Sequence, residues 1–61
     1  MLEYIKTILV KVSFDKKIFE KELRKAIKSL IGDELKDLQK WCYTQFNETH
    51  PQVLQRCFVS A

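Results

Sequence analysis

Residues that make turns are almost missing from this sequence, which has one glycine and one proline among 61 residues. A β protein needs many tight turns, and glycine and proline supply many of them. The composition therefore argues against a turn-rich β fold, and it provides no glycine-rich loop to cradle a phosphate. Because 46% of the residues are hydrophobic, the chain is also too apolar for disorder. We therefore expect an all-α protein.

Cysteine is scarce as well, with Cys42 and Cys57 as the only two. This number is below the density of small domains that are built on disulfides. Structural zinc commonly has four ligands that include a closely spaced cysteine pair, whereas these cysteines lie 15 residues apart and His50 is the single histidine. A hairpin centred near His50 would place the two cysteines opposite each other. We expect two buried, reduced thiols, no metal and no other cofactor.

Long apolar runs are missing too. The longest near the N-terminus is Ile8-Leu9-Val10, and charged residues flank it on both sides, at Glu3, Lys6 and Lys11. A signal peptide has about 7–15 apolar residues in a row, and a membrane-spanning helix has about 20. We therefore expect a cytoplasmic protein without a membrane partner.

The length of the chain allows one domain, residues 1–61. A domain of this size buries only about 60% of the surface that its unfolded chain exposes, so its stability is marginal. Multi-domain enzymes, dinucleotide-binding folds and barrels are excluded by length. Nucleophilic catalysis needs a poised nucleophile in a cleft, and so small a bundle uses its apolar residues for the core. We expect no enzymatic activity, no catalytic residues and no small-molecule substrate.

Hydrophobic periodicity predicts four helices, over about residues 2–12, 16–31, 34–46 and 50–58. The short connections favour a small three- or four-helix bundle of antiparallel helical hairpins. Residues 7–12 also contain β-branched side chains that suit a strand. Helix is favoured there because the sequence offers no second strand to pair with. A strand that pairs within an oligomer is the alternative.

The ends of the second helix carry recognisable signals. Asp15 is expected to cap its first turn, with Phe14 and Phe19 packed together as a hydrophobic staple. Gly32 is expected to end the helix in the left-handed conformation. Asp33 would then cap the third helix.

The second helix has a basic face opposite its apolar one. Residues 1–30 contain eight basic and four acidic side chains, whereas residues 31–61 contain three and four. At 100° per residue, five basic side chains fall within about one third of the helical wheel. We call them the basic arc: Lys17, Lys21, Arg24, Lys25 and Lys28. Like charges one turn apart destabilise a helix slightly, so the arc indicates binding of nucleic-acid phosphates or of an acidic partner. A solvated, lysine-rich face is the alternative.

Aromatic residues gather in the second half of the chain. Trp41 and Tyr43 cannot both lie on the apolar stripe of the third helix, so at least one is exposed or is covered by another element. Exposed aromatic side chains are frequent anchors of protein interfaces. We therefore expect a protein interface at Trp41, Tyr43 and Phe58. A core that wraps around several sides of the helices is the alternative.

Several segments together resemble a group of short bacterial helical proteins of unknown function. They are Leu2-Glu3-Tyr4, Lys11-Val12-Ser13-Phe14-Asp15, Phe19-Glu20-Lys21-Glu22-Leu23-Arg24-Lys25-Ala26 and Trp41-Cys42-Tyr43. The resemblance covers nearly the whole chain. It implies a bacterial, cytoplasmic setting and carries no activity with it.

Two functions are compatible with these patterns. The first is a non-catalytic protein-interaction module, either an accessory or adaptor subunit of a larger assembly or a homo-oligomer. The alternative is a small nucleic-acid-binding protein, such as a ribonucleoprotein component of the ribosomal type. It would contact the phosphate backbone through the basic arc without reading the base sequence.

Overall fold

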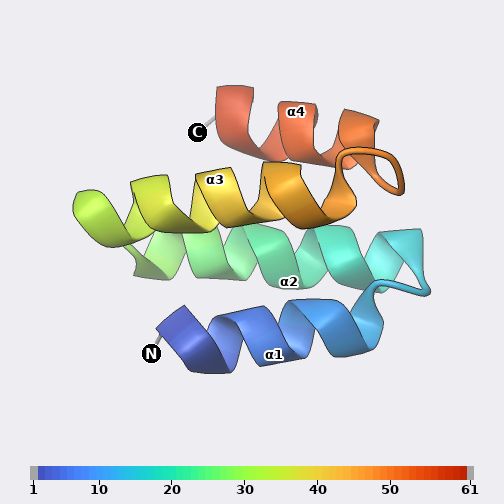
Figure 1. The fold of residues 1–61 in the computed structure, drawn as a ribbon, viewed down its shortest axis with the longest axis horizontal. Helices are drawn as coiled ribbons and strands as arrows, with labels where there is room; N and C mark the ends of the chain where they lie inside the picture. The colour runs from blue at the N-terminus through green and yellow to red at the C-terminus, as the bar shows by residue number, and fades with distance from the viewer. Residues whose placement is uncertain (1, 61) are drawn as a thin grey trace.

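Four helices form the computed structural model, which describes residues 2–60. They are α1 (Leu2–Val12), α2 (Lys16–Ser29), α3 (Asp33–Phe46) and α4 (Pro51–Ser60). Successive helices run in opposite directions, so the start of α1 and the end of α4 lie at the same end of the bundle (Figure 1). The predicted all-α bundle is confirmed, with four helices over residues 2–60. Residues 7–12, which also suited a strand, are helical and belong to α1.

The helices do not all pack against their neighbours in sequence. The closest packing joins α1 to α2, α2 to α4 and α3 to α4, while the contact of α1 with α3 is smaller. The backbones of α2 and α3 approach each other less, although only three residues connect them. Their side chains meet across the core, where the rings of Phe19 and Phe46 lie edge to face at 4.8 Å between centroids.

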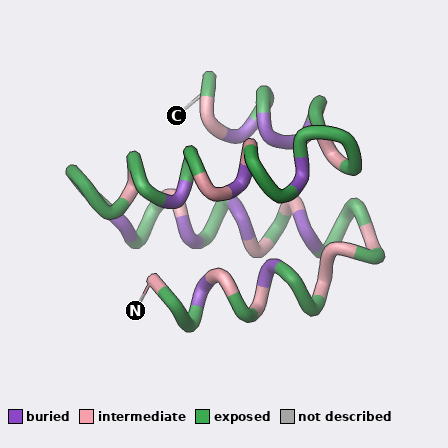
Figure 2. The backbone as a smooth tube through the Cα atoms, in the orientation of Figure 1, coloured by how far each residue is buried: buried purple, intermediate pink, exposed green. Residues whose placement is uncertain are grey.

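Each helix is buried along one side and exposed along the other (Figure 2). The core brings together twelve buried residues from all four helices and the α2–α3 turn: Ile5, Leu9, Phe19, Leu23, Ala26, Leu30, Leu38, Cys42, Phe46, Val53, Leu54 and Cys57. None of the buried residues within the described chain is charged or polar. Every helix within residues 2–60 is too short or too polar to cross a bilayer.

The start of α2 shows one confirmed signal and one wrong prediction. The Asp15 carboxylate accepts hydrogen bonds from the backbone N–H groups of Lys17 and Ile18, at 2.9 and 3.2 Å, so Asp15 is the N-cap. The expected staple does not form, because the side chain of Phe14 is 82% exposed. The ring of His50 instead stacks on Phe19, with 4.6 Å between centroids.

The turn between α2 and α3 also differs from the prediction. α2 ends at Ser29, and Leu30 takes an extended conformation that places its side chain in the core. Gly32 has a φ of 62° but a ψ of −132°, so it is not a left-handed helical cap, and it directly precedes α3. Asp33 is already the first residue of α3 rather than its cap. The burial of Leu30 explains the early exit of the chain from α2.

Candidate functional surfaces

The basic arc lies on the outer side of α2, and all five of its side chains are exposed. Two of them are paired with acidic neighbours on the same helix. Arg24 bonds Glu20 at 3.0 Å, and Lys25 lies 3.7 Å from Glu22. The hydrogen bond with Glu20 raises the pKa of Arg24. Glu20 also reaches Arg56 on α4 at 3.5 Å, a contact between helices that the sequence pattern did not indicate.

The other three members of the basic arc form no ion pair with any described residue: Lys17, Lys21 and Lys28. They occupy the middle of the arc on the helical wheel, whereas the paired Arg24 and Lys25 lie at its edges. The arc therefore presents three free ammonium groups in a row along one helix. Such a row suits phosphates or carboxylates of a partner equally well.

Trp41 lies at the seam between α1 and α3. It lines a shallow hollow of about 420 Å³, which we call the Trp41 hollow, together with Glu3, Lys6, Thr7, Val10 and Lys11. The indole ring is half-buried and packs edge to face on Phe46, at 5.5 Å between centroids. The ammonium group of Lys6 lies 5.6 Å from the ring centroid, within range of a cation–π contact. The hollow lies where α1 packs against α3, and this contact is smaller than those of α1 with α2, α2 with α4 and α3 with α4.

Tyr43 and Phe58 lie elsewhere, where α3 meets α4. Their ring centroids are 6.1 Å apart, and both side chains are half-buried against the core. The three aromatic residues of the predicted interface are therefore divided between two places. Trp41 borders α1, whereas Tyr43 and Phe58 contact each other.

Most of the exposed apolar side chains belong to the first half of the chain, which the sequence analysis did not select as an interface. They are Tyr4, Val10, Phe14, Ile18, Ile31 and Val59. A usable signal was present in the helical wheel, because Tyr4 and Val10 fall outside the apolar stripe of α1. Single exposed apolar residues are common on protein surfaces. Such a residue therefore indicates an interface only where it lies beside other features of a binding site.

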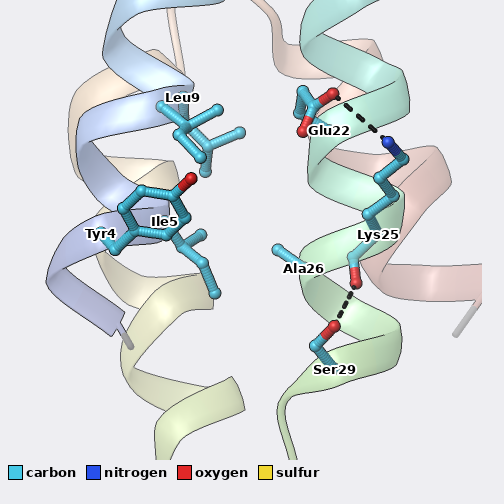
Figure 3. Close-up of a pocket in the computed structure, with 8 residues that line it drawn as sticks. Tyr4, Ile5, Leu9, Glu22, Lys25, Ala26 and Ser29 are labelled. Carbon is cyan, nitrogen blue, oxygen red and sulfur yellow. Dashed lines mark hydrogen bonds and ion pairs between the residues drawn. The ribbon is translucent and has the colours of Figure 1, made fainter.

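A groove of about 170 Å³ runs between α1 and α2 (Figure 3). It lies on the side of α1 away from the Trp41 hollow. We call it the α1–α2 groove, and its lining consists of Tyr4, Ile5, Ile8, Leu9, Glu22, Lys25, Ala26 and Ser29. Ile5, Leu9 and Ala26 are buried, whereas Tyr4 is 67% exposed. The Ser29 hydroxyl donates to the carbonyl oxygen of Lys25 at 3.0 Å. The groove thus has an apolar floor and a polar wall on α2.

Cys42 and Cys57 are free and buried, as predicted, on the facing helices α3 and α4. Burial raises the pKa of the Cys42 thiol to about 12, and the neighbouring Cys57 adds to this shift. Burial also raises the pKa of Cys57. Both thiols therefore stay protonated at neutral pH, and a thiol is a far weaker nucleophile than a thiolate. Residues 2–60 contain no group of three or more metal-ligating side chains in reach of one ion.

His50 connects two turns that are 37 residues apart in sequence. Its Nε2 donates a hydrogen bond to the carbonyl oxygen of Ser13, at 2.6 Å, and its ring is stacked on Phe19. The connection ties the α1–α2 turn to the start of α4. These contacts are those of a packing residue, and the hydrogen bond to Ser13 occupies Nε2.

No protein-family model, no curated protein and no solved structure matches this chain. The resemblance to short bacterial helical proteins therefore stays a prediction.

Proposed function

We propose that this chain is a non-catalytic protein-interaction module, an accessory or adaptor subunit that docks into a larger assembly through the Trp41 hollow. The observation that supports this function is the position of Trp41, half-buried at the loosely packed seam between α1 and α3. A partner segment seated there would complete the burial of the indole and cover Val10. Tryptophan residues in such central, desolvated positions dominate the energy of many interfaces.

The chemistry of the remaining side chains supports a non-catalytic role. His50 is held by Ser13 and Phe19, and the raised pKa of Cys42 suppresses its thiolate. We place the module in the cytoplasm, where thiols stay reduced. A homo-oligomer is the other form that this proposal can take, and the experiment below separates the two.

Replacing Trp41 by alanine should weaken association with the native assembly at least about 30-fold, because a hot-spot side chain contributes about 2 kcal/mol or more. Val10→Glu should do the same by placing a charge in the Trp41 hollow, and it leaves the core intact because Val10 is 54% exposed. The measurement is the amount of assembly that coelutes with the tagged chain in size-exclusion chromatography of native lysate. Sedimentation of the purified chain reports self-association.

The matched control is Val59→Glu, the same substitution at a valine on α4 that is 74% exposed. It should leave association unchanged. Thermal melts establish that each variant is folded. Full association of both the Trp41 and the Val10 variants would refute docking through this hollow. A loss of self-association in the purified chain would identify the partner as a second copy.

The second candidate function is binding of nucleic-acid phosphates through the basic arc. It is favoured by one observation, the three exposed lysines Lys17, Lys21 and Lys28 that lack an acidic partner among the described residues. Such contacts would give affinity without base specificity. Their energy would come from counterion release, which makes it strongly dependent on salt.

Replacing Lys17, Lys21 and Lys28 together by glutamine should reduce the salt dependence of binding to a 20-nucleotide RNA. The slope of log K against log salt should fall by about 0.7–0.9 per lost phosphate contact. Thermal stability should stay equal or rise slightly, because the variant relieves repulsion between like charges along α2. Fluorescence anisotropy between 50 and 300 mM KCl measures the slope.

The control removes the same charge elsewhere, by Lys11, Lys36 and Lys40→Gln. These lysines are also exposed. If both triple variants change the slope equally, the binding reflects net charge and not the basic arc. If the arc variant binds the native assembly normally while Trp41→Ala does not, the nucleic-acid function is refuted and the interaction module is supported.

A further inference from the structure

The α1–α2 groove combines three properties in one place. Its floor is aliphatic, formed by the buried Ile5 and Leu9 on α1. Ala26 and Ser29 are small, so α2 leaves open space opposite the exposed ring of Tyr4 (Figure 3). Lys25 belongs both to the groove lining and to the basic arc, so the basic arc borders the groove on α2. The groove is therefore apolar inside, and the basic arc borders it along α2.

We propose that the α1–α2 groove binds an acidic amphipathic helix of a partner protein. Apolar side chains of this helix would lie against Tyr4, Ile8 and Ala26, and its carboxylates would contact the lysines of the basic arc. Because α1 has 11 residues, a partner helix of about three turns matches its length at about 1.5 Å per residue. In helix-in-groove recognition, the bound helix inserts apolar side chains that are spaced one turn apart into the groove.

Charge complementarity selects this occupant. Glu22 is the one carboxylate in the groove lining, and it is paired with Lys25 at 3.7 Å. Lys21 and Lys28 lie about one turn before and one turn after Lys25 on α2, and neither forms an ion pair with a described residue. Carboxylates at this edge would be attracted over the Debye length of about 8–10 Å in physiological salt.

Two other occupants fit less well. A second copy of this chain that paired symmetrically through the groove would bring two basic arcs together, and like charges across an interface are unfavourable. A single-stranded nucleic acid binds by stacking its bases on aromatic side chains, and the groove floor is aliphatic apart from Tyr4. An acidic helix satisfies both the apolar floor and the basic edge.

The inference rests on the proposed function as an interaction module, but it concerns the other side of α1 from the Trp41 hollow. The two surfaces share no lining residue among those that the structure describes. Variants at one surface therefore leave the other intact. This separation allows each proposal to fail alone.

The probe is a fluorescein-labelled synthetic peptide of about 15 residues, with leucines at alternating third and fourth positions and glutamates on both flanks. Its control is the same peptide with lysines in place of the glutamates. Binding to the full chain is measured by anisotropy at 50 and 300 mM NaCl. We expect the glutamate peptide to bind at least ten-fold more tightly than the lysine peptide, with affinity falling several-fold at the higher salt. Amide chemical shifts in ¹⁵N-labelled protein should change at Tyr4, Ile8 and Ser29.

Two groove variants and two matched controls sharpen the test. Tyr4→Ala and Lys25→Gln should each weaken peptide binding at least five-fold, and neither residue is buried. Lys40→Gln makes the same change as Lys25→Gln, and Val59→Ala shortens another exposed apolar side chain; both positions lie outside the groove lining. Both controls should keep the dissociation constant within two-fold. This pattern would support the proposal.

The proposal is overturned by equal binding of both peptides, by no binding of either, or by shift changes centred on Trp41. It is also overturned if the groove variants weaken binding of the 20-nucleotide RNA instead of the peptide, or if they weaken self-association. If the peptide test fails while Trp41→Ala still loses the native assembly, the interaction module stands without this groove. If the peptide binds as expected but Trp41→Ala keeps the assembly, docking through the Trp41 hollow is what fails.

Discussion

Replacing Phe19 by alanine is expected to lower the free energy of unfolding by about 3–5 kcal/mol. The Phe19 side chain is completely buried, and its ring contacts both Phe46 and His50. At roughly 0.05–0.15 kcal/mol per residue, a chain of this length has a total stability of about 3–9 kcal/mol. The substitution therefore removes between about a third and all of the stability. Urea denaturation followed by circular dichroism at 222 nm would measure the loss.

The sequence contains a matched control for this change. Phe14 lies five residues earlier, and its side chain is 82% exposed. Phe14→Ala makes the identical chemical change and should alter the free energy of unfolding by no more than about 0.5 kcal/mol. Comparable losses at the two positions would show that the assignment of Phe19 to the core and Phe14 to the surface is wrong.

Raising the pH above about 9 should destabilise the protein through Cys42. The pKa of this thiol is about 12 in the folded chain, against an ordinary value of 9.0. Between these values the unfolded chain loses the Cys42 proton while the folded chain keeps it. The stabilisation is therefore complete below pH 9 and is lost as the pH rises towards 12. The slope is about 1.4 kcal/mol per pH unit for one such group, and the raised pKa of Cys57 acts in the same direction.

Urea denaturation at a series of pH values from 8 to 10 tests this dependence. Cys42→Ala is the comparison, because it removes this thiol and leaves every other residue of the chain in place. We expect the variant to be less stable at pH 8 but to lose stability less steeply above pH 9. Parallel pH profiles for the two proteins would exclude Cys42 as the source of the effect.

The sequence by itself determined the helices and their inward sides. The spacing of Phe19, Leu23 and Ala26 identified the buried side of α2, and all three residues are in the core. Asp15 marked the start of this helix, and the structure shows the predicted cap. The exposure of the basic arc followed from the same wheel. These features depend on contacts within about one turn of a helix, so a local pattern contains the information that specifies them.

Only the tertiary structure decided which helices meet and therefore which surfaces are left open. His50 contacts Ser13, 37 residues away in sequence, and stacks on Phe19. His50 thus lies against Phe19 where local spacing predicted Phe14, and Phe14 is exposed. Leu30 enters the core and ends α2 early, which moves Gly32 out of its expected role. The Trp41 hollow and the α1–α2 groove both depend on how closely α1 approaches its neighbours. Helical periodicity gives the direction of each side chain from its own axis, but coverage of that side chain depends on a second helix that is distant in sequence.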